Sequence, residues 1–249
     1  MRSIKIGIFL LNLIIFQFVA AQKSQPVYVI VHGAWGGSWA FKEVDRLLTD
    51  MGNTVYRPSL TGQGERVHLA NESVGLETHI TDVVNTILFE ELDQIILVGH
   101  SYGGMVVTGV ADRLPERIQK LVYLDAFVPE HNENVNTIFV NDPKKYTIKN
   151  GGIVPSWVPK DQPPPTDVPH PYKTFTDRID LKNPKRLMLS THYIHTVEKG
   201  QTPEKDDFIM HANRARKKSW PVYILESDHN PQWSAPKALV ELFKKIEKQ

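Results

Sequence analysis

The feature of this chain that most restricts its fold is a regular alternation of short apolar runs with segments of helical spacing. The apolar runs have the length of strands and lie at residues 27–33, 54–60, 94–100, 120–126, 186–196 and 221–227. The segments of helical spacing lie at 39–52, 76–92, from Tyr102 to about Pro115, at 206–219 and at 234–248. Because the runs are mostly apolar throughout, we expect strands that are buried on both faces. The pattern therefore predicts an α/β protein with a mostly parallel sheet and helices on both faces.

The alternation is interrupted after Pro129. Residues 130–184 are rich in proline and show little periodicity, as in VPSWVPKDQPPPTDVPHP. A long segment of this kind is uncommon inside a compact domain unless it serves a function or is disordered. Since it lies between two expected strands of the sheet, we expect it to form an inserted cap over the sheet.

A hydrophobic stretch at the N-terminus has the features of an export signal. A short basic start precedes the apolar run IGIFLLNLIIFQFVA, and Val19 and Ala21 are small residues at the two positions that a signal peptidase reads. We expect residues 1–21 to be a signal peptide that is cleaved before Gln22, with export to the periplasm or the extracellular space. The alternative is a retained membrane anchor, for which the apolar run is short. Residues 22–249 are then expected to form a single domain with no membrane association.

Charge and cysteine content exclude several classes of partner. The chain has 29 basic and 28 acidic residues, and this balance indicates neither nucleic-acid binding nor binding to an anionic membrane. It has no cysteine, so an exported form would depend on its core rather than on disulfides for stability. His192 and His195 form an H-x-x-H pair, but two histidines without a third ligand are weak evidence for a metal. We expect neither a metal nor a cofactor, and the oligomeric state stays open.

One motif combines a serine with a sharp turn. The sequence LVGHSYGGM contains G-x-S-x-G with Ser101 at its centre, after one expected strand and at the start of an expected helix. Gly99 and Gly103 have no β-carbon, which lets the chain turn sharply and expose the serine oxygen. A serine hydroxyl is a poor nucleophile until a neighbouring base takes its proton. The motif predicts Ser101 as a catalytic nucleophile if the chain also supplies a base, an acid and an oxyanion hole, and the alternative is a structural glycine turn.

An oxyanion hole requires backbone N–H groups that point at the developing negative charge. After this type of turn, one N–H comes from the residue that follows the nucleophile, here Tyr102, and the second comes from a loop after an earlier strand. The segment VHGAWGGSW at 31–39 is such a loop. We expect Ala34 to be the second donor, and the alternative is a glycine-rich turn without a role.

The base and the acid are expected at the ends of later strands. A base that works near neutral pH is a histidine, and with this turn it comes last in the chain. His229 is the last of ten histidines and follows the final expected strand in ILESDHNPQW. Asp125 follows the strand after the nucleophile and is the preferred acid, with Glu198 as the alternative. Asp228 adjoins His229, and side chains of adjacent residues do not normally make the required contact.

The order of these motifs resembles the α/β-hydrolase superfamily. The resemblance rests on the His-Gly loop, GHSYGG, LDAFVPE and DHNP, and it covers nearly all of residues 26–247. RPSLTGQGERVHL at 57–69 and VPHPYKTFTDRI at 168–179 look like a bacterial esterase-like subgroup that is similar to plant methylesterases and hydroxynitrile lyases. The resemblance implies Ser101, Asp125 and His229 as a triad, although the acid of the plant branch usually follows the later strand.

From these residues we predict an exported serine hydrolase that cleaves an uncharged carboxylic ester or lactone through an acyl-enzyme, with a small molecule as its partner. Two alternatives stay open: a hydroxynitrile-lyase-like reaction on the same triad, and a non-catalytic binder of small ligands. Trp35, Trp157 and Phe127 are candidate substrate contacts, because aromatic side chains form apolar pockets with few rotamers to freeze.

Overall fold

Six parallel strands form the central sheet, in the order β2-β1-β3-β4-β8-β9. The computed structural model describes residues 25–139 and 146–249, so the expected signal peptide at 1–21 lies outside the described residues. The strands are β1 (Val27–Val31), β2 (Thr54–Tyr56), β3 (Ile95–His100), β4 (Ile118–Leu124), β8 (Ser190–Val197) and β9 (Val222–Glu226). The predicted parallel sheet is confirmed.

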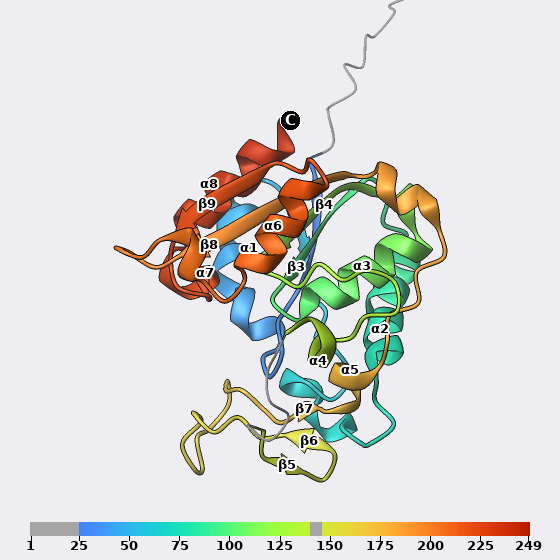
Figure 1. Cartoon of the computed structure of the whole chain (residues 1–249), viewed down its shortest axis with the longest axis vertical. Coiled ribbons are helices and arrows are strands. Elements are labelled where there is room, and N and C mark those ends of the chain that lie inside the picture. The colour runs from blue at the N-terminus through green and yellow to red at the C-terminus, as the bar shows by residue number, and fades with distance from the viewer. Residues whose placement is uncertain (1–24, 140–145) are drawn as a thin grey trace, which may run out of the picture.

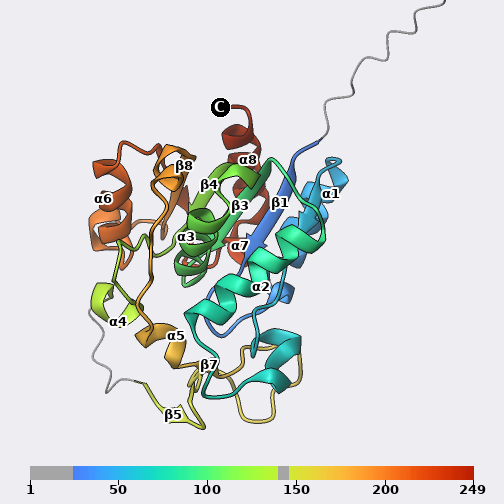
Figure 2. The same cartoon turned by 90° about the vertical axis from the view of Figure 1, so that its right-hand side faces the viewer.

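Helices cover both faces of this sheet (Figures 1 and 2). One face packs against α1 (Lys42–Asp50) and α8 (Pro236–Glu247), and the other against α2 (Leu76–Phe89), α3 (Gly103–Arg113) and α6 (Ile209–Lys217). Successive side chains of a strand point to opposite faces. In β3, Ile95 and Leu97 join the core under α2 and α3, whereas Ile96 and Val98 join the core under α1 and α8. The strands are therefore apolar along their whole length because both of their faces are buried.

The chain between β4 and β8 leaves the sheet and forms the cap at one end of the molecule, beyond the carboxyl ends of the strands (Figure 1). Its described part contains short helices and a small antiparallel sheet rather than irregular chain alone. These elements are α4 (Val135–Ile138), β5 (Ile148–Lys149), β6 (Gly152–Ile153), β7 (His170–Pro171) and α5 (Lys173–Thr176). None of the helices in the described ranges combines the length and the apolarity that a membrane crossing needs.

Several boundaries differ from those that the sequence pattern predicts. The strand expected at 54–60 ends at Tyr56, because β2 is an edge strand and Pro58 has no N–H for a ladder. The strand expected at 186–196 begins only at Ser190, after a 3₁₀ turn at Pro184–Met188.

The start of the last helix also differs from its sequence pattern, which predicts Ser234 as the N-cap. The N-cap of α8 is Ala235, and Ser234 instead ends the short helix α7 (Pro231–Ser234). Its hydroxyl lies 2.7 Å from Ser227 Oγ and 2.8 Å from Asp228 Oδ1. The prediction is wrong because this serine closes the loop that carries His229 rather than the first turn of the helix.

Six buried histidines make the stability of the domain depend on pH. Burial lowers the pKa of His32, His79 and His192 to about 4 and that of His100 and His211 to about 3, and it keeps the pKa of His170 well below its usual value. In the unfolded chain the pKa of a histidine is about 6.5. Below that pH the unfolded state binds more protons than the folded state, so stability falls as the pH drops. As the pH falls from 6.5 towards the pKa in the folded state, each such histidine lowers the free energy of unfolding by about 1.4 kcal/mol per pH unit.

We expect the free energy of unfolding, measured with urea, to fall by roughly 8 kcal/mol between pH 7.5 and pH 5.5. His211→Gln should reduce the slope of the free energy of unfolding against pH by about 1.4 kcal/mol per pH unit, which corresponds to one proton. His131→Gln, at a histidine with an exposed side chain, is the matched control with which this reduction is compared. Equal free energies of unfolding at the two pH values would contradict this expectation.

Candidate active site

Ser101 lies in the sharp turn between β3 and α3 and has a φ of 53°, in the left-handed region that is strained for a residue other than glycine. The two motif glycines do not take up this positive φ. A β-carbon on Gly103 would lie 2.6 Å from the carbonyl oxygen of Val31, and one on Gly99 would lie 2.6 Å from a methyl group of Val107. The glycines are therefore needed for close packing of the turn against β1 and α3, while Ser101 itself adopts the turn conformation.

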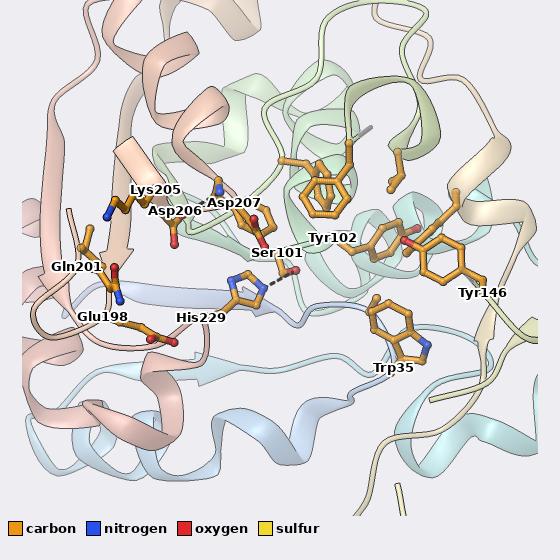
Figure 3. Close-up of a pocket in the computed structure, with 17 residues that line it drawn as sticks. Trp35, Ser101, Tyr102, Tyr146, Glu198, Gln201, Lys205, Asp206, Asp207 and His229 are labelled. Atoms are coloured by element: carbon orange, nitrogen blue, oxygen red, sulfur yellow. Dashed lines mark hydrogen bonds between the residues drawn. The ribbon is translucent and has the colours of Figure 1, made fainter. Parts of the chain in front are cut away.

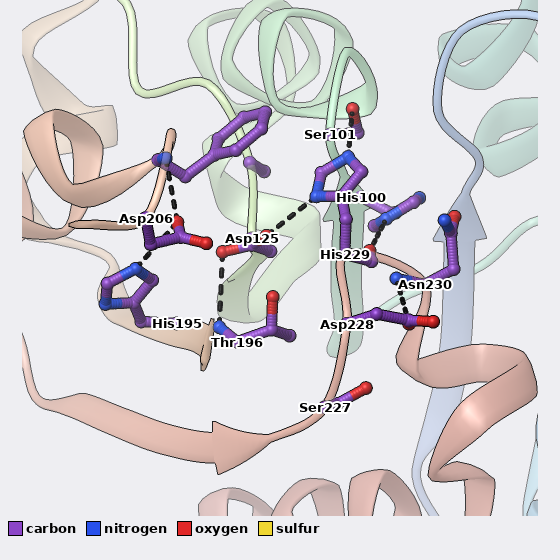
Figure 4. A network of polar contacts seen from close by, with 12 residues as sticks. His100, Ser101, Asp125, His195, Thr196, Asp206, Ser227, Asp228, His229 and Asn230 are labelled. Atoms are coloured by element: carbon purple, nitrogen blue, oxygen red, sulfur yellow. Dashed lines mark hydrogen bonds and ion pairs between the residues drawn. The ribbon is translucent and has the colours of Figure 1, made fainter. Parts of the chain in front are cut away.

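The imidazole of His229 lies between Ser101 and Asp125. Its Nε2 is 2.9 Å from Ser101 Oγ (Figure 3) and its Nδ1 is 2.7 Å from Asp125 Oδ2 (Figure 4). Asp125 is fully buried, and its Oδ1 accepts the N–H of Thr196 at 3.2 Å. The structure thus joins an acid, an imidazole and a hydroxyl in one hydrogen-bonded chain, in the arrangement that activates a nucleophile.

Glu198, the alternative acid, does not occupy this place. Within residues 25–139 and 146–249, the ring nitrogens of His229 make hydrogen bonds to Asp125 and Ser101 and to no other side chain. Glu198 is exposed and lines the cavity beyond β8. Asp125 follows β4, which pairs with β8 in the sheet. Its carboxylate therefore also accepts the backbone N–H of Thr196 in β8, and this bond holds the carboxylate beside the imidazole.

Two backbone N–H groups lie beside Ser101 without a protein acceptor. Tyr102 and Ala34 line the same cavity as Ser101 and His229. In the part of the chain that the structure describes, neither of their N–H groups donates to a protein atom. The N–H of Tyr102 also stands directly before the first turn of α3, where the helix dipole favours negative charge. The pair can therefore serve an oxyanion next to Ser101.

The cavity around Ser101 has a volume of about 580 Å³ and two chemically different ends. Trp35 and Tyr146 lie at the end under the cap, and the other aromatic residues that line the cavity are Tyr102, Phe127, Phe139, Phe175 and Phe208. The segment between β8 and α6 forms the polar end, with Glu198, Gln201, Lys205, Asp206 and Asp207. Figure 3 shows Ser101 and His229 between the labelled residues of the two ends.

Of the three residues expected to contact substrate, Trp35 and Phe127 line this cavity and Trp157 does not. Trp157 is 56% exposed, and its indole N–H donates to Asp167 Oδ2 at 2.8 Å. Its ring packs edge-on against the ring of Trp35, with 5.0 Å between centroids. Trp157 is therefore separated from the cavity by the ring of Trp35 in this structure, and its contact with substrate stays a prediction.

The sequence profile of the alpha/beta hydrolase family matches residues 28–242. The chain belongs to this family. A carbendazim-hydrolyzing esterase from Nocardioides sp. (strain SG-4G) is 56% identical over 108 residues, which are 43% of this chain and 45% of that esterase. A methyl jasmonate esterase from Vitis vinifera is 24% identical over 182 residues, 68% of this chain and 66% of that protein. The aligned part of the chain thus spans about half to two thirds of the length of these relatives.

Solved structures show the same fold. An extracellular α/β-hydrolase from a Paenibacillus species has a TM-score of 0.71 at 23% identity, with 89% of this chain and 98% of that chain covered. A methylesterase from Arabidopsis has a TM-score of 0.68 at 23% identity, with 90% of this chain and all of that chain covered. At this identity the likeness concerns the fold alone.

Two further side chains of this α/β hydrolase support His229, and sequence reasoning missed both roles. The ring of Phe208 stacks on the imidazole, with 4.7 Å between centroids and 17° between planes. His100 donates from Nε2 to the backbone carbonyl of His229 at 2.8 Å. His100 lies inside the serine motif, directly before Ser101, and nothing in the local sequence connects it to His229. Phe208 lies at the start of an expected helix, and no local signal connects it to His229.

The structure gives the H-x-x-H pair no shared metal site. Residues three apart on a strand point to opposite faces, so His192 and His195 diverge. His195 does approach two carboxylates, and it offers a ligand atom within 4.8 Å of those of Asp125 and Asp206. Each carboxylate is already bound, Asp125 to His229 at 2.7 Å and Asp206 to His195 Nε2 at 2.9 Å. Burial raises the pKa of Asp206, but its hydrogen bonds from His195 and the N–H of Phe208 outweigh this and lower it. We therefore interpret the three residues as parts of two separate hydrogen-bonded pairs, Asp125 with His229 and His195 with Asp206, that lie close together.

Proposed function

We propose that this α/β hydrolase is a serine esterase that cleaves an uncharged carboxylic ester or lactone. The observation that carries the proposal is the hydrogen-bonded chain from Asp125 through His229 to Ser101, next to the two N–H groups of Ala34 and Tyr102. The likeness to esterases from Nocardioides and Vitis vinifera supports it. Acyl transfer requires a nucleophile, a base and an oxyanion site within contact distance of one another, and this cavity offers them.

The first half of the proposed reaction forms an acyl-enzyme. His229 Nε2 takes the proton of Ser101 as Oγ attacks the ester carbonyl, and the carbonyl electrons move onto oxygen. The N–H groups of Ala34 and Tyr102 stabilise that oxyanion. Asp125 keeps the proton on Nδ1, so that Nε2 can accept, and its charge stabilises the imidazolium. The oxyanion then collapses, and His229 returns the proton to the leaving alkoxide, which departs as the alcohol.

The second half reverses these roles with water in place of the alcohol. His229 takes a proton from water, and the resulting hydroxide attacks the acyl carbonyl. The same two N–H groups bind the second oxyanion, and its collapse expels the serine oxygen, which recovers its proton from His229. The free acid is the product, and for a lactone it carries the former leaving group as a hydroxyl.

The lining of the cavity favours an ester that carries an apolar or aromatic group. The aromatic end of the cavity lies under the cap beside Tyr102, whereas the charged residues lie at the opposite end. We further propose that the protein is exported, as the residue pattern of 1–21 predicts, and that it acts on a small molecule outside the cytoplasm.

A second candidate function, cleavage of a cyanohydrin, is favoured by one observation. Plant hydroxynitrile lyases, which this chain resembles in its motifs, use a lysine near the base in addition to the triad. Sequence reasoning finds no lysine near His229, but the structure places Lys205 in the lining of the same cavity. An α-hydroxynitrile lyase from Arabidopsis is 30% identical over 104 residues, 41% of this chain. Release of cyanide from mandelonitrile would support this function over the esterase.

Covalent labelling and a burst assay test the proposed esterase. A fluorophosphonate should modify the protein, and mass spectrometry of the digested product should place the label on Ser101. With a p-nitrophenyl ester of a short acid, rapid mixing should show a burst of p-nitrophenolate of about one equivalent, since an acyl-enzyme releases the alcohol first. Absence of both labelling and turnover on esters, lactones and cyanohydrins would instead support a non-catalytic binder.

A further inference from the structure

The residue that follows the Ala34 donor has an unusual backbone conformation. Trp35 has a φ of 64°, in the left-handed region. This conformation is uncommon for a large side chain and persists only where surrounding contacts hold it in place. The contacts of Trp35 therefore determine the shape of the loop that carries the Ala34 N–H.

All three polar groups of Trp35 bind to the cap. Its backbone N–H donates to His170 Nδ1 at 3.3 Å, and its carbonyl accepts the N–H of Val168 at 2.9 Å. Its indole N–H donates to the carbonyl of Ile153 at 3.0 Å. Its ring also packs edge-on against Phe175, with 5.9 Å between centroids. The oxyanion loop is thus bound at three points to a segment more than 100 residues away in the sequence.

His170 is suited to the role of acceptor. It is fully buried, and burial keeps its pKa well below the usual value, so that it remains neutral and one of its nitrogens can accept. The hydroxyl of Thr174 lies 2.8 Å from His170 Nε2 and donates to the carbonyl of Pro171 at 2.8 Å. We assign His170 the tautomer with its proton on Nε2, in which the Thr174 oxygen accepts from Nε2–H and the N–H of Trp35 donates to Nδ1. In the other tautomer Nδ1–H would donate to Gln63 Oε1, 3.0 Å away, and the N–H of Trp35 would lack this acceptor.

We propose that the cap holds the oxyanion loop in its working conformation through Trp35, with His170 as a positioning residue. The proposal rests on the proposed function, because it concerns the donor Ala34. An oxyanion donor works at about 2.7–3.1 Å from the oxygen, and a displacement of about 1 Å can cost about 100-fold in rate. The cap is then part of the frame that aligns the donor, as well as a cover over the substrate.

Two isosteric substitutions separate positioning from mere packing. Asparagine places its oxygen near the position of Nδ1, so His170→Asn keeps an acceptor for Trp35. His170→Gln places its polar group near Nε2 and leaves the N–H of Trp35 without that acceptor. For p-nitrophenyl acetate, which is too small to fill the aromatic end, we expect kcat to fall at least tenfold in His170→Gln with KM changed less than threefold. His170→Asn should keep kcat within about threefold of the unchanged protein.

Hydrogen exchange tests the same proposal without any catalysis. Amide exchange in a peptide that spans residues 31–39 should become at least tenfold faster in His170→Gln and stay near the original rate in His170→Asn. Trp35→Phe provides a second variant if the histidine variants unfold, since it removes the bond to Ile153 and keeps a ring and the backbone bonds. It should speed exchange in the same peptide, and exchange alone is its readout because Trp35 also lines the cavity.

Several outcomes would overturn the positioning role. Equal kcat in the two His170 variants, or equal loss of kcat together with an equal drop in Tm, would show that His170 only stabilises the cap. Unchanged exchange at residues 31–39 in Trp35→Phe and His170→Gln would show that the cap does not hold the loop. Failure of the proposed function is a different result, because the unchanged protein would then neither react with fluorophosphonate nor hydrolyse the ester while the exchange differences remained.

Discussion

Ser101→Ala should reduce ester hydrolysis by several orders of magnitude, up to about 10⁶ in turnover, because the acyl-enzyme cannot form without the serine oxygen. The fold should remain intact. The backbone N–H of Ser101 donates to the carbonyl of Leu124, and its carbonyl accepts the N–H groups of Gly104 and Phe127. None of these bonds involves the side chain. Residual turnover should come from the oxyanion site and from substrate binding alone. Steady-state kinetics on a p-nitrophenyl ester, with circular dichroism to check the fold, would measure the effect.

A serine outside the cavity gives the matched control for this variant. Ser73 is exposed, and among the described residues its hydroxyl hydrogen-bonds to Asn71 alone. Ser73→Ala should keep both full activity and fluorophosphonate labelling, whereas Ser101→Ala should lose both. If Ser101→Ala retained more than about a tenth of the activity, Ser101 would not be the nucleophile, and another group in the cavity would have to carry the reaction.

Asp125→Asn should lower turnover by about 10⁴, the size found when the aspartate of a triad is replaced by its amide. The carboxylate accepts two N–H groups, from His229 Nδ1 and from Thr196. In the variant, the amide oxygen would accept from Thr196 and the amide NH₂ would face Nδ1. The imidazole would then carry its proton on Nε2, where it could not accept the proton of Ser101. The charge that stabilises the imidazolium would also be lost.

Glu198→Gln is the matched control, because it makes the same chemical change on a carboxylate of the same cavity. It should cost less than tenfold in turnover, since Glu198 makes no hydrogen bond to His229 among the described residues. The pair is compared by kcat on one ester at one pH, and both variants should retain the circular dichroism of the unchanged protein. The opposite ranking would assign the acid to Glu198 and would leave the serine hydrolase proposal standing.

Several features of this α/β hydrolase could be predicted from the sequence because they depend on neighbours in the chain. The apolar runs predict a parallel sheet, because a strand that is buried on both faces cannot alternate with polar residues. The motif around Ser101 predicts the turn before α3, because glycines on both sides of a serine allow a close approach of backbone that a β-carbon would block. The placement of Asp125 and His229 at strand ends also follows, because parallel strands bring their carboxyl ends to one edge of the sheet.

Other features were decided by packing between distant segments. Trp157 is an aromatic residue of the cap like Phe175, but only the folded cap shows that Trp35 separates Trp157 from the cavity. Phe208 covers the imidazole of His229 because α6 begins beside the loop after β9, and nothing in its own neighbourhood indicates this. Ser234 has the composition of an N-cap, yet its hydroxyl binds Ser227 and Asp228 instead.

The sequence by itself determined the strand and helix order, the serine turn and the set of residues able to form a triad. Only the tertiary structure shows that Asp125 rather than Glu198 binds the imidazole of His229, which side chains pack around His229, and that the cap binds Trp35. Asp125 and His229 are 104 residues apart, and Trp35 and His170 are 135 apart. A hydrogen bond needs its two atoms within about 3 Å. Whether two such distant side chains meet that limit depends on strand order, on register and on the path of the cap, and local pattern carries no information about these.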